Sequence, residues 1–373
     1  MKLVKVLAIV GTRPEAIKLA PVIKALEDSP IHDCVVCSTG QHREMLNQMV
    51  QIFNLRIKYE FDIMVPNQTL ATLTGKLIES LDTIIKAEKP DWLLIQGDTT
   101  TCFAASLAAF YNHVKVAHVE AGLRTYNLKS PFPEEANRQL VAKLTDMHFA
   151  PTRAAAQNLL REGITKQKIA ITGNTVIDTL LCVSRDISWC NNWKSSFNTA
   201  FKVIQQELDF VLITGHRREN HGEGFFNICR ALVSLANRYP AWHFIYPVHL
   251  NPNVKQPVSK QLSNIPNIHL IDPLSYEPFV YLLKKCKIVL TDSGGVQEEA
   301  PSLGKPVLVM RNTSERIEGI EMGTAKLVGT EEQSIIKNVS LLIENNDEYH
   351  KMANIINPYG DGKASERIIN YLV

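Results

Sequence analysis

The chain alternates short, β-branched apolar runs with longer segments of helical character. In its first half, runs at 3–10, 34–38, 92–95 and 115–119 are each followed by a stretch that suits a helix. The same alternation starts again at Phe210–Thr214, with further strands expected at 243–246, 268–271, 288–291 and 307–310. Such alternation is typical of βαβ units, which build a parallel sheet with helices on both faces. The pattern therefore predicts an α/β protein with two Rossmann-like domains.

A polar segment without clear periodicity, residues 184–198, separates the two runs of this pattern. Such a composition is typical of an interdomain linker, so we expect the hinge there. The last segment, 360–373, opens with Gly-Asp-Gly and then has helical character. Its pattern alone allows it to pack on either domain.

Length and charge narrow the classes of function. The 373 residues leave room for about two domains, and 45% hydrophobic with 21% charged residues is an ordinary globular composition. The formal net charge is only +2. No strong overall field exists to bind nucleic acid or an anionic membrane, so neither is an expected partner, and any anionic ligand must be met by local groups.

The seven cysteines are odd in number and scattered through apolar or helical stretches, which favours reduced thiols and a cytoplasmic protein. Cys34 and Cys37 have a redox-like spacing, but an offset of three in a strand places them on opposite faces, so we expect no redox or metal role. The apolar run 6–10 is too short for a signal peptide. No apolar stretch approaches the ~20 residues that a membrane span needs.

Ligands of parallel sheets bind beyond the carboxyl ends of the strands, so polar residues there are the candidates for chemistry. After the first strand, a glycine turn, a proline expected at the first helical position, and the cations Arg13 and Lys18 form a candidate anion site. The turn lacks the G-x-G-x-x-G fingerprint, so nothing predicts a dinucleotide cofactor. The alternative is that Arg13 and Lys18 are solvated helix charges.

Three carboxylates follow the next strands. Asp98 stands after one strand, Glu120 ends another, and Glu134 lies in the first turn of a helix with Arg138 one turn on. Asp98 could instead cap the helix at Thr100, and a first-turn glutamate is favoured by the helix dipole in any case. Together the three suit general acid and base chemistry.

The second half offers a histidine and a glycine turn at strand ends. His216 follows the strand Phe210–Thr214, and Ser293, Gly294 and Gly295 open a helix after the strand at 288–291. Small residues at a helix start let a diphosphate approach backbone N–H groups, and Glu299 is placed to accept hydrogen bonds from a ribose. Alternatively, His216 is only a surface histidine, and the Ser-Gly-Gly segment is only a structural turn between strand and helix.

These motifs in combination resemble the non-hydrolysing UDP-N-acetylglucosamine 2-epimerases, over essentially the whole chain. They are Gly-Thr-Arg-Pro-Glu at 11–15, Gly-Asp-Thr-Thr at 97–100, His-Val-Glu-Ala-Gly-Leu-Arg at 118–124, Pro-Glu-Glu-Ala-Asn-Arg at 133–138, Thr-Gly-His-Arg-Arg-Glu-Asn at 214–220 and Asp-Ser-Gly-Gly at 292–295. Two motifs depart from the family pattern: Glu-Arg-Ile-Glu at 315–318 and Glu-Met-Gly at 321–323.

The resemblance implies a fold of the glycosyltransferase-B type with the active site in the interdomain cleft. The N-terminal domain would comprise residues 1–175 plus 359–373, because the C-terminal helix crosses back, and the C-terminal, UDP-binding domain residues 176–358. The implied reaction is reversible epimerisation of UDP-N-acetylglucosamine to UDP-N-acetylmannosamine, by elimination of UDP to 2-acetamidoglucal and re-addition. It supplies N-acetylmannosamine units for cell-surface polysaccharide and needs no cofactor or metal. A homodimer is implied as well.

The resemblance also implies roles for individual residues, at the positions where this sequence matches the family's motifs. Catalysis is implied for Asp98, Glu120, Glu134 and His216, without assigning a carboxylate to either half-reaction. Substrate and UDP binding are implied for Arg13, Lys18, Arg138, Phe279, Ser293, Gly294, Gly295 and Glu299. A second, activating UDP-N-acetylglucosamine is expected to bind at Gln41, His42, Arg43, Gln68 and His249. Three rivals remain open at this point: a hydrolysing epimerase that releases free N-acetylmannosamine, a sugar-nucleotide glycosyltransferase of the same fold, and a non-enzymatic sugar-nucleotide sensor.

Overall fold

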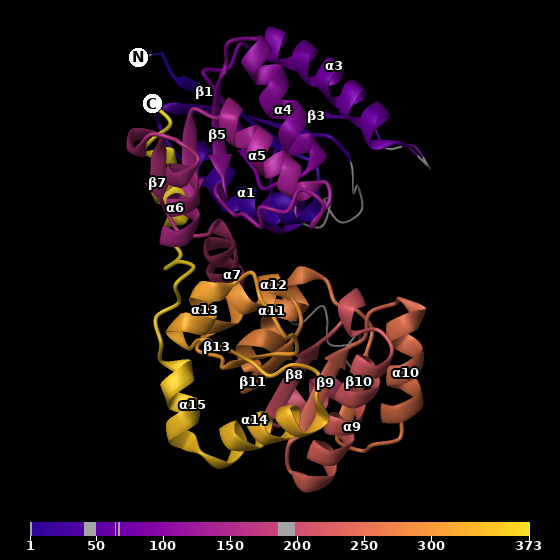
Figure 1. Ribbon diagram of the computed structural model, residues 1–373. Coiled ribbons are helices and arrows are strands. Elements are labelled where there is room, and N and C mark those ends of the chain that lie inside the picture. The colour runs from indigo at the N-terminus through magenta and orange to yellow at the C-terminus, as the bar shows by residue number, and fades with distance from the viewer. Residues whose placement is uncertain (1, 41–49, 64, 66–67, 186–197) are drawn as a thin grey trace. The chain divides into compact units, whose positions relative to one another are not determined.

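The computed structural model describes residues 2–40, 50–63, 65, 68–185 and 198–373 (Figure 1). The chain divides into two compact units. The first comprises Met1–Thr179 with Tyr359–Val373, and the second comprises Leu180–Pro358. Most of the expected hinge at 184–198 lies outside the described residues, as does most of the helical stretch expected after the run at 34–38, which spans residues 42–52.

The first unit is built on one sheet of seven strands in the order β3-β2-β1-β4-β5-β6-β7. All of its strand pairings are parallel. The strands are β1 Val4–Val10, β2 His32–Ser38, β3 Ile57–Glu60, β4 Trp92–Gln96, β5 Lys115–Val119, β6 Met147–Ala150 and β7 Ile169–Ile171. The central strands β1 and β4 are apolar and buried on both faces, as parallel strands covered by helices must be.

Helices follow the strands of the first sheet in βαβ fashion. They are α1 Arg13–Glu27, α3 Leu70–Glu88, α4 Thr100–Tyr111, α5 Glu134–Leu144, α6 Arg153–Arg161, the 3-10 turn η1 Lys166–Lys168, α7 Thr175–Arg185, which runs on into the second unit, and α16 Ala364–Ile369. Helix α4 packs between α3 and α5 (Figure 1), and α16 packs on α1. Apolar side chains of α3, α4 and α5 cover Leu7, Ile9, Leu93 and Ile95 of the sheet.

The C-terminal segment is part of the first unit. The carboxylate of Asp178 accepts hydrogen bonds from the backbone N–H groups of Ala364, at 3.2 Å, and Ser365, at 2.8 Å. One ring nitrogen of His32 donates to Leu372 O at 2.8 Å. These contacts fix the C-terminal segment to the first unit, where Ile368 and Leu372 are fully buried.

The second unit contains a parallel sheet of six strands in the order β10-β9-β8-β11-β12-β13. The strands are β8 Phe210–Thr214, β9 His243–Pro247, β10 Ile268–Ile271, β11 Ile288–Thr291, β12 Val307–Val309 and β13 Ala325–Leu327. The helical segments are α8 Asn198–Gln205, η3 Arg218–Asn220, α9 Glu223–Arg238, α10 Pro252–Leu262, α11 Tyr276–Lys285, α12 Gly294–Glu299, η4 Ala300–Leu303, α13 Ile317–Met322, α14 Glu332–Glu344 and α15 Asn346–Ala353. Phe225, Phe244 and Tyr246 are fully buried in its core.

The predicted α/β class with parallel sheets is confirmed, and several strand bounds agree to the residue, such as Lys115–Val119 and Ile288–Thr291. Three short strands, β3, β6 and β13, were not expected. Pro14 is the second residue of α1 and not the first, because the helix begins at Arg13. In the described part of the chain, no helix is both long and apolar enough to cross a membrane.

Glu88, at the end of α3, is buried and joined to two lysines. Its carboxylate lies 2.6 Å from Lys5 Nζ and 2.7 Å from Lys58 Nζ, and it accepts a hydrogen bond from the Tyr59 hydroxyl. Burial alone would raise the pKa of Glu88, but these three donors outweigh it and lower the pKa to about 2. The Glu88 carboxylate therefore stabilises the first unit at pH values at which it is ionised.

Replacing Glu88 with Gln is expected to lower the free energy of unfolding at pH 7 by about 1 kcal/mol, because the exposed Lys58 partner is screened by water. A lowered folded-state pKa gives stability above the unfolded value of about 4.3, and that stability is lost as the pH falls towards 2. Urea unfolding of wild type and variant at several pH values measures the difference. A difference that stays constant between pH 5 and pH 2 would contradict the ion-pair account.

Candidate active site

The carboxyl edge of the first sheet brings together the turns after β1, β4 and β5. These strands are neighbours, with Ala8 paired to Leu94 and Gln96 paired to Val119. The glycine turn at Gly11, the turn at Gly97 and the residue Glu120 therefore emerge side by side, where parallel sheets bind their ligands.

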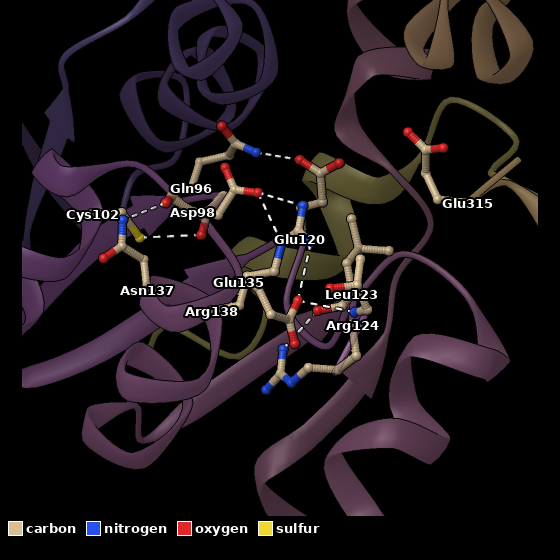
Figure 2. Close-up of polar contacts among 12 residues, drawn as sticks. Gln96, Asp98, Cys102, Glu120, Leu123, Arg124, Glu135, Asn137, Arg138 and Glu315 are labelled. Carbon is tan, nitrogen blue, oxygen red and sulfur yellow. Dashed lines mark hydrogen bonds and ion pairs between the residues drawn. The ribbon is translucent and has the colours of Figure 1, made fainter. Parts of the chain in front are cut away.

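Glu120 follows β5 and is almost fully buried. Its Oε2 accepts hydrogen bonds from Lys18 Nζ and from Gln96 Nε2, and its Oε1 accepts one from Asn174 Nδ2 at 3.3 Å (Figure 2 shows the Gln96 contact). The backbone of Glu120 has φ +63°, a left-handed conformation that non-glycine residues rarely adopt. Strain of this kind is found at functional sites, where the surrounding structure holds it in place.

Asp98 is bound to α5. Arg138 donates to Asp98 Oδ2 from Nε at 2.9 Å and from Nη2 at 2.6 Å, and Asn137 Nδ2 donates to Asp98 O at 2.9 Å (Figure 2). The alternative that Asp98 caps the following helix is wrong, because Thr99 is the N-cap and its hydroxyl accepts from Cys102 N at 3.1 Å. The Asp98 carboxylate thus does no capping.

Glu134 is the first residue of α5, as the sequence predicts for a first-turn carboxylate. Its Oε2 is buried and has no hydrogen-bond partner among the residues that the structure describes. The next residue, Glu135, is the one that Arg138 contacts, at 3.2 Å, and it accepts from Thr125 N and Tyr126 N at 3.0 Å each. Glu135 therefore holds the preceding loop.

The turn after β1 is fixed by a buried carboxylate. Glu15 accepts from Gly11 N at 2.8 Å, from Thr12 N at 2.5 Å and from Thr99 Oγ1 at 2.5 Å, which ties this turn to the one after β4. Burial raises the pKa of Glu15 despite these donors. A side chain at Gly11 would meet Thr101 Oγ1 at 2.6 Å, so only glycine fits there. Arg13, at the start of α1, is half-buried.

In the second unit the turn after β8 is held by Asp292, which follows β11. Asp292 is fully buried, and its Oδ2 accepts from His216 N at 2.9 Å, Arg217 N at 2.8 Å and Asn220 Nδ2 at 3.1 Å. Its Oδ1 lies 3.6 Å from His216 Nδ1, and the His216 side chain is 43% exposed. Partial burial lowers the pKa of His216, with His249 and Arg217 acting in the same direction, while the Asp292 carboxylate opposes the shift.

The Ser-Gly-Gly turn lies at the end of the neighbouring strand. Ser293 is the N-cap residue of α12, which Gly294 and Gly295 open, as predicted. Glu299, at the end of α12, is buried and accepts from the Tyr276 hydroxyl at 2.8 Å. Phe279 lies half-buried on α11.

The residues expected to bind an activating ligand are only partly described. Gln41, His42 and Arg43 lie outside the described residues. Gln68 belongs to the first unit and accepts from Val65 N at 3.1 Å. His249 belongs to the second unit, is exposed, and stacks on His216 with ring centroids 5.5 Å apart.

Two residues of these sites lie outside the motifs: Gln96 and Asn174, which are donors to Glu120. Glu15 and Asn220 belong to motifs, but the sequence assigned them no role, and the structure shows that Glu15 joins two turns and that Asn220 supports Asp292. Gln96 carried a signal, since it is a buried polar residue at the end of an otherwise apolar strand. Among the described residues, no group of three or more histidine, cysteine, aspartate or glutamate side chains is arranged to hold a metal.

Chemically, the first unit presents carboxylates that are held by cations at the ends of adjacent strands, an arrangement suited to moving protons. The second unit presents a half-exposed histidine and a small-residue turn, which suit an anionic ligand. A sugar nucleotide, which carries both a sugar and a diphosphate, suits the two sets of residues.

The family model described as UDP-N-acetylglucosamine 2-epimerase matches residues 24–373. A UDP-N-acetylglucosamine 2-epimerase of Neisseria meningitidis is 53% identical over 369 residues, with 99% of each chain covered. The enzyme of that name from Escherichia coli K12 is 50% identical, covering 99% of this chain and 98% of its own.

Comparison with solved structures gives matches to proteins of the same name. The Neisseria meningitidis UDP-GlcNAc 2-epimerase bound to UDP-GlcNAc superposes with a TM-score of 0.89 over 99% of both chains, at 53% identity. The Methanocaldococcus jannaschii enzyme in complex with UDP-GlcNAc and UDP has a TM-score of 0.78 over 99% of both chains, at 35% identity. The glycotransferase of kitacinnamycin, 12% identical with a TM-score of 0.67 and full coverage of both chains, shares the fold alone, which is of the glycosyltransferase-B type. The chain belongs to the UDP-N-acetylglucosamine 2-epimerase family.

Proposed function

We propose that this protein interconverts UDP-N-acetylglucosamine and UDP-N-acetylmannosamine by inversion at carbon 2. The observation that carries the proposal is the pair of carboxylates Asp98 and Glu120, each held by a cation at the ends of adjacent strands. Relatives about 50% identical over the whole chain bear the name of this epimerase.

The reaction needs acid and base groups because the carbon 2 proton is not next to a carbonyl. A carbanion at carbon 2 would have no resonance sink, so the base takes the proton while the bond from carbon 1 to the UDP oxygen breaks. The electron pair of the C–H bond becomes the second bond between carbons 1 and 2, which gives 2-acetamidoglucal and UDP. Re-addition of UDP at carbon 1, with protonation of carbon 2 from the other face, gives the epimer. No net oxidation occurs.

The two units then have different tasks. The first unit, which corresponds to an N-terminal domain of 1–175 with 359–373, supplies the carboxylates Asp98, Glu120 and Glu134, with Arg13, Lys18 and Arg138 as its cations. The second unit, which corresponds to a domain of 176–358, binds UDP through Phe279, Ser293, Gly294, Gly295 and Glu299. His216 would stabilise the departing diphosphate, which develops negative charge as the bond breaks. The product supplies N-acetylmannosamine units for cell-surface polysaccharide.

Proton NMR of a reaction in deuterated water tests this function. An epimerase must incorporate deuterium at carbon 2 of sugar nucleotide that still carries UDP, because the proton lost in the elimination is replaced from solvent. Free N-acetylmannosamine would instead identify a hydrolysing epimerase. No change in the sugar nucleotide, with the protein shown to be folded, would reject both and favour a glycosyltransferase or a sensor.

We also propose that UDP-N-acetylglucosamine activates the enzyme at a second site, which Gln41, His42, Arg43, Gln68 and His249 would line. The stacking of His249 on His216 supports this, because a ligand held by His249 would change the surroundings of the residue proposed to assist UDP departure. A ligand shifts an equilibrium only by its differential affinity for the two states, so the activator must bind the active state more tightly.

Pure UDP-N-acetylmannosamine is therefore expected to react slowly until a trace of UDP-N-acetylglucosamine is added, and then to accelerate by roughly the 5–150-fold range of allosteric coupling. Progress curves with and without the trace measure the effect. Replacing His249 with Ala should reduce the acceleration. Full velocity without any trace would remove the second site and leave the catalytic assignment untouched.

We further propose that the protein is a homodimer and lies in the cytoplasm. Phe110 and Tyr111, at the end of α4, are 56% and 63% exposed, and exposed aromatic residues are enriched in subunit interfaces. Sedimentation velocity would give about twice the chain mass of 41.9 kDa for a dimer. The cysteines that the structure describes are free thiols, which suits a reducing compartment.

A further inference from the structure

Two consecutive carbonyl oxygens between β4 and α4 are held by side chains from outside the turn. His118 Nε2 lies 2.7 Å from Gly97 O, and since a carbonyl only accepts, the ring nitrogen donates. The Cys102 thiol donates to the same oxygen at 3.3 Å, and Asn137 Nδ2 donates to Asp98 O at 2.9 Å (Figure 2). The backbone on both sides of the Asp98 carboxylate is therefore fixed by three side chains.

His118 takes part in no step of the proposed reaction, although it stands two residues before Glu120. It is 2% exposed, and burial lowers its pKa to about 4, so the ring is neutral at pH 7. A neutral imidazole carries one proton, and the bond to Gly97 O places that proton on Nε2. Within the described chain, Nδ1 has no hydrogen-bond partner. His118 is thus a neutral, one-directional donor.

The Gly97–Asp98 turn needs such a donor. Gly97 has φ +78°, a conformation that glycine adopts freely and can also leave freely. A glycine at the base of a catalytic turn would let the following carboxylate move unless its peptide group were held. A displacement of about 1 Å in a reacting group is enough to lower a rate by about 100-fold.

We propose that His118 is a positioning residue, which, together with Asn137, holds the Gly97–Asp98 turn so that the Asp98 carboxylate stays in its reactive position on Arg138. This rests on the proposed epimerase function, in which Asp98 is a catalytic group. His118 acts through the backbone and exchanges no proton with the substrate. Strand β5 then serves two carboxylates: its residue His118 orients Asp98, and Glu120 follows its last residue.

Replacing His118 with Leu removes the donor. We expect turnover (kcat) to fall by at least ~30-fold while KM changes by less than about threefold, because the lost contact affects a reacting group and not substrate binding. His118→Gln offers an amide N–H at a similar distance from the backbone, so it should recover kcat to within about fivefold of wild type. Asn137→Leu removes the donor to Asp98 O and is the second test, should His118→Leu fail to fold.

His148→Leu is the matched control. His148 lies on β6 directly opposite His118, is fully buried, and both of its ring nitrogens lack a hydrogen-bond partner in the part of the chain that is described. Replacing His148 with Leu also exchanges a buried polar ring for an apolar side chain, but it removes no hydrogen bond to the Gly97–Asp98 turn. Its kcat should stay within about threefold of wild type. An equal loss in His148→Leu and His118→Leu would overturn the proposal, as would wild-type kcat in folded His118→Leu or a His118→Gln variant no better than His118→Leu.

Nitrogen-15 NMR of the histidine rings keeps this inference separate from the proposed function. The wild-type protein should show His118 neutral at pH 7 with its proton on Nε2, and the carbon-13 signal of the Asp98 carboxyl should shift in His118→Leu but not in His148→Leu. A proton on Nδ1 of His118, or an Asp98 signal that is unchanged in His118→Leu, would overturn the inference. Absence of epimerisation in wild type would count against the proposed function, and the NMR result would still decide whether His118 positions Asp98.

Discussion

Replacing Glu120 with Gln is expected to lower turnover by at least ~100-fold, the usual scale for loss of a general acid or base. Glutamine keeps the shape of the side chain but cannot take up a proton. It also replaces one carboxylate oxygen with an NH2 group, although the carboxylate accepts from Lys18, Gln96 and Asn174. The new NH2 group at position 120 would then face one of these three donors, and the negative charge that pairs with Lys18 would be lost.

Initial rates followed by proton NMR, with folding checked by circular dichroism, measure this effect. The control is Glu79→Gln, which makes the same chemical change on the exposed face of α3 and should leave turnover at the wild-type value. Asp98→Asn and Glu134→Gln should show losses of the same order, at least ~100-fold each. Wild-type turnover in any two of the three active-site variants would remove the carboxylate set from catalysis.

The sequence predicts where ligands bind because strand ends are local features. An apolar β-branched run that ends in a polar residue and a glycine marks a strand and its carboxyl edge, and such runs located β4 and β5 to within one residue. The short strands β3 and β13 carry only four and three residues with mixed burial, so no run is long enough to show a period. Tertiary pairing, and not local pattern, makes them strands.

The partners within the site could not be predicted in the same way. Lys18 and Glu120 are 102 residues apart in the chain, and Asn174 and Glu120 are 54 apart. Their contact depends on the order of the strands, which periodicity does not encode. The sequence suggested Lys18 and Arg138 as cations for the substrate, and the structure shows that they also hold Glu120 and Asp98. The left-handed backbone of Glu120 has no sequence signal, because a glutamate is not expected there.

The second large loss of turnover is expected from replacing Asp292, which belongs to the second unit. The sequence contains Asp292 in the motif at 292–295 but assigns it no role. In the structure it is fully buried, and its Oδ2 accepts hydrogen bonds from the backbone of His216 and Arg217 and from the Asn220 amide. Removing a buried acceptor leaves its donors unsatisfied, which costs about 1–3 kcal/mol for each group that water cannot reach. The turn that carries His216 would then no longer be held in place.

Asp292→Ala is therefore expected to lower turnover by at least ~100-fold, since it displaces a residue proposed to assist catalysis. Asp292→Asn separates the two tasks of the carboxylate, because an amide oxygen can still accept from the backbone of His216 and Arg217 while the negative charge is gone. The variant with Asn should keep the fold and the turn. Thermal unfolding of both variants, compared with wild type, shows whether the turn or the charge is the larger loss.

The charge has a pH signature of its own. The Asp292 carboxylate raises the pKa of His216 against the lowering effect of burial, so Asp292→Asn should lower that pKa further. If the imidazolium form of His216 assists UDP departure, activity falls as the pH rises through its pKa, and in Asp292→Asn the fall should begin at a lower pH. The pH dependence of kcat/KM measures this shift in both proteins. His216→Ala should lack this limb of the profile, and a limb that remains at its wild-type position in Asp292→Asn would assign the titration to another group.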